Sequence, residues 1–145
     1  MTEEVKKCIE QAERFLVLRE HNKAELTLKL KNKGYEDSEI SQTVKYLEDC
    51  NELDERRYIQ AFIRSNNKRH PEGKIVVFQR LLQKGADKSL SKTILDEVYT
   101  PEYAEQMLRE CADNVIRKGK NLSKEQLLVK IAKYGFNISE IKKLL

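Results

Sequence analysis

Apolar residues in this chain are spaced three or four apart in short stripes, and the stripes recur with a period of about fifty residues. The period is clearest in the glycines: Gly34, Gly85 and Gly135 are 51 and 50 residues apart, and each closes a short amphipathic segment. Each glycine is predicted to end a helix, because the left-handed conformation costs glycine no steric strain. The chain is therefore expected to consist of repeated helical units.

The segment before each glycine aligns with its counterparts when the chain is shifted by one repeat. Its apolar positions lie four residues apart, so they share one helix face. They are Leu26 and Leu30, then Val77 and Leu81, then Leu127 and Ile131. The same shift aligns Asn22, Gly73 and Ser123, which are suitable N-terminal caps. Start, apolar stripe and stop thus repeat together.

Two further stripes complete each repeat. The stripe after each glycine predicts a helix with an N-terminal cap at Ser38, Ser89 or Ser139. A stripe further upstream predicts another helix, capped at Asp54 in the second repeat and at Thr100 in the third, where Pro101 occupies the first turn. Each repeat is therefore expected to contain three helices.

These patterns predict an all-α protein made of three tandem three-helix repeats, at residues 1–50, 51–100 and 101–145. No segment shows the sustained alternation of a strand, so no sheet is expected. A unit of about fifty residues buries too little surface to be robust alone, and the joins are short, so the repeats should stack into an elongated, curved array. Tyr46 and Tyr99 lie next to the joins and could pack between repeats; the alternative is that they are half-exposed surface residues.

With these motifs in place, the sequence resembles the RecX family of bacterial RecA regulators. The resemblance rests on REHNKAEL at 19–26, KGYEDSEI at 33–40, LDERRYIQAFIRS at 53–65 and LLQKGADKSL at 81–90, with LLVKIAKYGFNISEIKKLL at 127–145 similar to the last repeat of the family. Ala86 departs from the branched apolar residue usual there, and Ser91 stands where the other repeats have Ile40 and Ile141. Leu90 is expected to supply the apolar contact that Ser91 lacks.

The resemblance implies a regulator without enzymatic activity that binds the RecA recombinase along the groove of its filament on DNA. It implies that strand exchange and the co-protease activity of the filament are mostly restrained. Periodicity and charge alone predict only an elongated helical repeat with a basic excess.

Charge adds a preference for an anionic partner. The net charge is +4, and 36% of the residues are charged. Residues 1–50 carry −2, whereas residues 51–100 and 101–145 carry +3 each, so the last two repeats hold the basic excess. Weak, non-specific contact with single- or double-stranded DNA is therefore expected. Helix-turn-helix base reading is not expected, because KAELTLKLKNK offers lysines and few side chains for bidentate readout.

Composition also sets expectations about compartment and cofactors. Cys8, Cys50 and Cys111 are far apart and lack close Cys or His partners, which favours free thiols in a reducing interior over a zinc site. No apolar run reaches the roughly 18 residues of a membrane span, and the charged first residues do not match a signal peptide. We expect a cytoplasmic monomer with no metal, no cofactor and no membrane partner.

Catalytic constellations are not evident, because His21 and His70 lie in different repeats and no phosphate loop or nucleophile elbow is present. The candidate binding residues are instead basic side chains in stretches without acidic neighbours. They are Arg64, Lys68, Arg69, Lys74, Arg80, Lys84, Arg117, Lys118, Lys120 and Lys124. The alternative is that they only solubilise helix faces. Arg56 and Arg57 belong to the same basic stretch, but Asp54 or Glu55 could pair with them locally.

Overall fold

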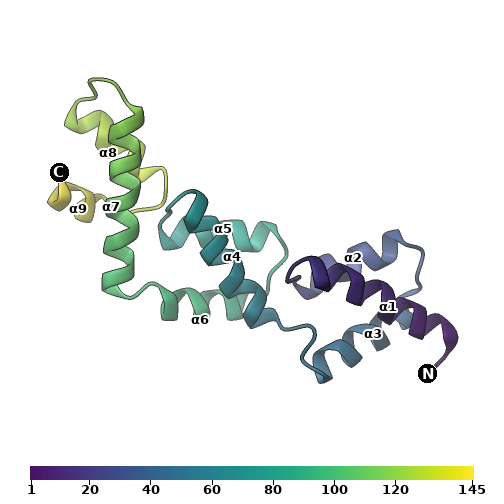
Figure 1. Ribbon diagram of the computed structural model, residues 1–145. Coiled ribbons are helices and arrows are strands. Elements are labelled where there is room, and N and C mark those ends of the chain that lie inside the picture. Colours follow the sequence, from purple (N-terminus) through teal and green to yellow (C-terminus); the bar gives the residue numbers. More distant parts are fainter.

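The computed structural model describes all 145 residues and contains nine α-helices and no strand (Figure 1). The first unit comprises α1 (Glu3–Leu18), α2 (Lys23–Asn32) and α3 (Asp37–Asp49). The second unit comprises α4 (Glu55–Arg69), α5 (Lys74–Gln83) and α6 (Lys88–Val98). The third unit comprises α7 (Pro101–Lys118), α8 (Lys124–Ala132) and α9 (Ile138–Leu144). The all-α prediction is confirmed.

The units follow one another in a curved row, with the N-terminus in the unit at one end and the C-terminus in the unit at the other (Figure 1). The main helix contacts lie within units: α1, α2 and α3 pack on one another, as do α4, α5 and α6, while α8 packs on both α7 and α9. The predicted elongated array is confirmed. A membrane crossing would require a longer and more apolar helix than any of the nine.

The glycines end helices as predicted. Gly34, Gly85 and Gly135 have φ of +96°, +87° and +93°, in the region that favours glycine. Gly34 and Gly85 follow the C-caps of α2 and α5 directly, and Gly135 lies two residues after the C-cap of α8. The predicted helix stops are therefore correct.

Most predicted N-caps are also correct. Asn22 and Ser123 cap α2 and α8 in reciprocal capping boxes, and Gly73 precedes α5. Asp54 and Thr100 cap α4 and α7.

The caps predicted at Ser38, Ser89 and Ser139 are wrong. The helices begin earlier, after Glu36, Asp87 and Asn137. The Asp87 carboxylate accepts from the Leu90 amide and the Asn137 side chain accepts from the Ser139 amide, and all three serines lie inside the first turn of their helices.

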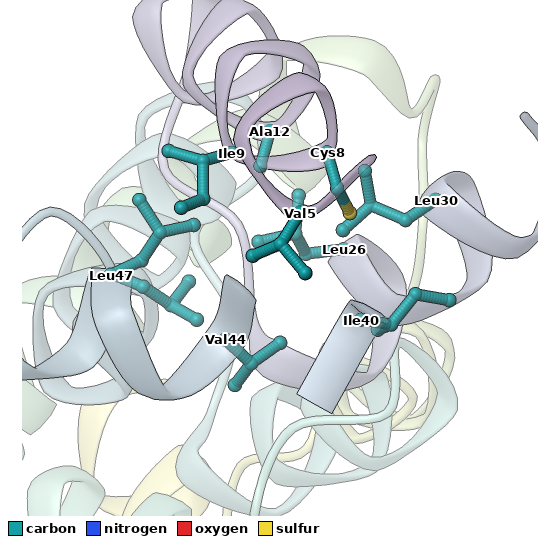
Figure 2. Close-up of a cluster of buried hydrophobic side chains, with 10 residues drawn as sticks. Val5, Cys8, Ile9, Ala12, Leu26, Leu30, Ile40, Val44 and Leu47 are labelled. Carbon is teal, nitrogen blue, oxygen red and sulfur yellow. The ribbon is translucent and has the colours of Figure 1, made fainter. Parts of the chain in front are cut away.

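The apolar stripes form three clusters of buried side chains. Figure 2 shows the first, where Leu26 and Leu30 of α2 meet residues of α1 and α3. Leu53, beyond α3, joins this cluster. The predicted stripe positions Val77, Leu81 and Ile131 are fully buried in the second and third clusters. Leu90 packs partly buried on the second cluster, as expected where Ser91 replaces an isoleucine.

The second and third units share apolar contacts. Met107 of α7 belongs to the cluster of the second unit, and Phe136 packs against both clusters. Tyr99 is buried, and its ring meets that of Tyr103 edge-on with centroids 4.9 Å apart. Tyr99 therefore packs between units as predicted, whereas Tyr46 is 40% exposed and follows the surface alternative.

A close backbone approach adds to this junction. The amide of Gly73 donates to the carbonyl of Tyr134 at 2.7 Å. A Cβ atom on Gly73 would lie 2.1 Å from the carbonyl oxygen of Gly135, so only glycine fits there. The loop before α5 is thereby fixed to the end of α8.

The junction between the first and second units is polar. The Glu55 carboxylate, at the start of α4, accepts from the amides of Lys23 and Asp87, each at 2.9 Å. The Asn22 side chain donates to the carbonyl of Lys84 at 2.9 Å. No buried apolar cluster spans this junction. The two junctions of the array are therefore chemically different.

Candidate interaction surface

All ten predicted binding residues have exposed side chains, but they lie in three places. Arg64, Lys68 and Arg69 lie along the C-terminal half of α4. Lys74, Arg80 and Lys84 belong to α5 and its C-cap. Arg117, Lys118, Lys120 and Lys124 surround the turn from α7 to α8. The array does not gather all ten into one site.

Arg80 already has an intramolecular partner, although its side chain is exposed. Its guanidinium donates to both carboxylate oxygens of Glu72, at 2.7 and 2.6 Å. Burial raises the pKa of this carboxyl, but hydrogen bonds from Arg80 and Asn66 outweigh that effect and hold it below its usual value. Arg80 therefore anchors the loop between α4 and α5.

Asn67 and Tyr99 complete this buried network. The Asn67 side chain donates to the hydroxyls of Tyr99 and Tyr103, at 2.9 and 2.8 Å. The Tyr99 hydroxyl donates to the carbonyl of Glu72 at 2.6 Å. The α4–α5 loop is thus held from both the second and the third unit, which makes it a rigid platform.

Lys74 also has an intramolecular partner, since its ammonium lies 2.7 Å from the Asp96 carboxylate. Both side chains are about half exposed, so the pair contributes little to stability. Lys84 forms no ion pair, and its backbone carbonyl accepts the hydrogen bond from Asn22 of the first unit. These two lysines remain free to contact a partner at small cost.

Arg56 and Arg57 mostly reach distant partners. Arg56 pairs with Glu97 at 2.9 Å. Arg57 lies 3.9 Å from the local Asp54, but its shorter bond, 3.1 Å, is to Glu20 of the first unit. The local pairing expected as the alternative is therefore found for Arg57, beside its bond to the first unit, and not for Arg56.

The remaining predicted cations form no ion pair with any carboxylate. They are Arg64, Lys68, Arg69, Arg117, Lys118, Lys120 and Lys124; Arg117 donates only to the side-chain oxygen of Asn114. Basic side chains without acidic partners are available to an anionic surface. They occupy the second and third units, where the basic excess lies.

Of the predicted cations, Lys118 alone lines a cleft between the second and third units, which we call the α7–α8 cleft. It has a volume of about 510 Å³. One side comes from His70 and Pro71, after α4, and the other from Lys118, Lys130 and Lys133 of the third unit. Its lining contains no Asp or Glu.

Sequence reasoning missed Lys130 and Lys133. They lie in a further stretch without acidic residues, 126–139, but they are its only two cations, so a search for dense basic stretches did not single them out. They are three residues apart and therefore share a face of the α8 end, which a helical projection could have revealed. Their closeness to His70, sixty residues away, depends on how the units pack.

The buried His21 has a structural role. Its Nδ1 lies 3.0 Å from the carbonyl oxygen of Arg19, and its Nε2 lies 2.8 Å from the Lys29 ammonium. Burial lowers the pKa of this imidazole, and the positive charges of Arg19 and Lys29 lower it further. The neutral ring, donating to Arg19 and accepting from Lys29, fits this arrangement.

The sequence and the fold both match known proteins. The family model described as "RecX, first three-helix domain" matches residues 8–47. The Regulatory protein RecX of Chlorobaculum tepidum is 30% identical over 138 residues, which cover 93% of this chain and 84% of that protein. Its counterpart in Chlorobium phaeobacteroides is 27% identical over 146 residues, covering 97% and 92%.

Solved structures share the fold at lower sequence identity. RecX from Lactobacillus salivarius superposes with a TM-score of 0.85 at 18% identity, over 99% of this chain and 96% of that one. A second crystal structure, of a regulatory protein RecX, gives 0.81 at 19% identity, over 97% and 72%. The sequence match over 93% of the chain, the three-helix units and their order along the array together show that this chain belongs to the RecX family.

Proposed function

We propose that this protein regulates the RecA recombinase by binding its filament on DNA and mostly restraining strand exchange, ATP hydrolysis and co-protease activity. The observation that carries the proposal is the match to RecX regulatory proteins along nearly the whole chain. The protein acts by binding, as a monomer and without a cofactor or a reaction of its own. An elongated array suits this role, because it presents a long face to a filament.

The basic residues without acidic partners support an anionic target. They belong to the second and third units, whereas the first unit carries net negative charge. The rigid apolar junction holds these two units in a fixed relation. We therefore assign the contact with the filament mainly to the second and third units.

Co-sedimentation with RecA filaments assembled on single-stranded DNA tests the binding step. We expect the protein to pellet with filaments and to stay in the supernatant with RecA alone in the absence of DNA and nucleotide. A protein that remains in the supernatant at every filament concentration would refute the proposed partner. A matched control uses the DNA without RecA, which measures direct DNA binding.

A second candidate function is stand-alone nucleic-acid binding, favoured by the acid-free lining of the α7–α8 cleft. It requires binding to DNA without RecA, with an affinity that falls steeply as salt increases, because cations on phosphates release counterions. Binding that does not depend on salt, or no binding at low salt, would reject it.

A further inference from the structure

We propose that the α7–α8 cleft binds the phosphate backbone of single-stranded nucleic acid, with Lys118, Lys130 and Lys133 contacting phosphate oxygens and Tyr134 offering its ring to a base. This inference deepens the second candidate function and rests on it. It assigns the site, the form of the nucleic acid and the residues.

No carboxylate lines the cleft beside its lysines. Lys118 at the end of α7 and Lys130 and Lys133 at the end of α8 line one cavity, and none of them forms an ion pair. Like charges gathered without a counter-charge repel one another, so an anion would relieve that repulsion. At the floor, burial and the nearby Glu72 charge raise the pKa of the Cys111 thiol to about 11, so this side chain adds no negative charge near neutral pH.

The walls are held in place before any ligand arrives. Pro71 follows His70 into a buried loop, and the next residue, Glu72, is fixed by Arg80. The Gly73 amide then joins this loop to the Tyr134 carbonyl, directly beside the cleft. A site formed in advance binds without the entropic cost of ordering its loops.

The residue types suit a phosphate backbone beside bases. Lysine binds phosphate oxygens as a compact point charge, and three lysines line this cavity. Tyr134 is 38% exposed at the edge of the cleft, and aromatic rings beside a basic groove stack on the bases of single strands.

The size of the cleft favours a single strand. Pockets for small ligands run from about 300 to 1,000 Å³, and about 510 Å³ falls within that range, enough for one nucleotide-sized group. A duplex is a convex cylinder whose major groove alone is about 12 Å wide, so it cannot enter a cavity of this volume. The strand would cross the cleft with its phosphates toward α8.

The test measures fluorescence anisotropy of a labelled oligothymidine strand across a salt series. The triple variant K118Q/K130Q/K133Q should reduce the magnitude of the slope of log affinity against log salt by up to about 2, because each phosphate contact in a single strand contributes about 0.7. The matched control K33Q/K88Q/K92Q removes the same number of charges outside the cleft, at exposed lysines without ion pairs. It should leave the slope close to that of the unmodified protein. Tyr134→Ala should weaken binding about tenfold with the slope unchanged.

Thermal melting without DNA separates binding from folding. The triple cleft variant should melt close to the temperature of the unmodified protein, because the relief of repulsion offsets the lost interaction with the C-terminal ends of α7 and α8, and it should gain less stability from added oligothymidine. Equal slopes for the cleft variant and the control would overturn the proposal. Binding of polyglutamate in the cleft with unchanged oligothymidine binding would overturn it in favour of an acidic peptide.

The experiment also separates this inference from the main proposed function. Suppose the cleft variant loses strand binding, but the unmodified protein does not pellet with RecA filaments. The cleft assignment then stands and the RecA role is refuted. If instead the unmodified protein pellets with filaments and the cleft variant has the same salt slope as the control, the RecA role stands and the cleft assignment is refuted.

Discussion

At the scale of single residues, backbone conformation and buried polar groups decide most of the local structure. Gly34 is a clear case, because its φ is +96° and a Cβ atom there would meet nothing within 4 Å. Any cost of replacing it therefore comes from the backbone rather than from a clash. This separates it from Gly73, where the space itself is occupied.

Gly34→Val should lower the free energy of unfolding by about 1–2 kcal/mol, since a β-branched residue is strained in the left-handed region. Chemical denaturation measures the change, and Lys33→Val, one position earlier in right-handed conformation, is the control. An unchanged midpoint for the glycine variant would contradict its role as a helix stop.

His21 predicts a pH dependence of stability. Its pKa is lowered in the folded state, so the unfolded chain binds the proton more tightly. The contribution of His21 to the free energy of unfolding is therefore complete above the pKa of the unfolded chain, about 6.5. It is lost as the pH falls below that value toward the pKa of the folded state. The slope is at most about 1.4 kcal/mol per pH unit.

His21→Gln should flatten the loss of stability just below pH 6.5, as measured by urea unfolding at several pH values. His70→Gln, at an exposed position, is the matched control and should keep the slope of the unmodified protein. If the two variants gave the same profile, His21 would not be the titrating group.

At the scale of the helices, the sequence is most informative where a rule is local. The glycine stops and the caps Asn22, Asp54 and Thr100 were predictable, because each depends on a few neighbouring residues. The serine caps failed because each helix begins after another polar residue two positions earlier, Glu36, Asp87 or Asn137. The sequence was enough to predict the cations of α4 as candidate binding residues. Only the structure shows that these cations form no ion pairs.

The C-terminal half of α4 carries three cations that stabilise the helix only weakly and face solvent. R64Q/K68Q/R69Q should lower the free energy of unfolding by about 1 kcal/mol or less, mainly through the lost interaction with the helix dipole. If these residues contact the filament, binding to RecA filaments should weaken in co-sedimentation. Unfolding of the variant would show instead that the side chains are structural.

At the scale of the whole molecule, we propose that residues 1–50, 51–100 and 101–145 behave as three units joined by unlike junctions. The second and third share apolar contacts through Met107 and Phe136, while the first is held to the second by polar groups such as Glu55. Sequence reasoning placed the joins but not their chemistry. The bond from Asn22 to Lys84 connects residues 62 positions apart, so it depends on packing that no local pattern encodes.

Glu55→Ala removes a carboxylate that accepts from the amide of Lys23 across the polar junction and from the amide of Asp87 within the second unit. The free energy of unfolding should fall by about 1–2 kcal/mol, and small-angle scattering should show a wider spread of overall dimensions. Glu105→Ala, whose carboxylate pairs only within α7, is the control and should leave the scattering profile unchanged. Identical profiles for both variants would show that Glu55 does not hold the first unit in place.

The central claim is that this array regulates RecA, and the most direct measurement is RecA-dependent ATP hydrolysis on single-stranded DNA during titration with the purified protein. We expect hydrolysis to slow at amounts of the protein equal to or below those of RecA. An unchanged rate across that range would contradict a role in regulating RecA.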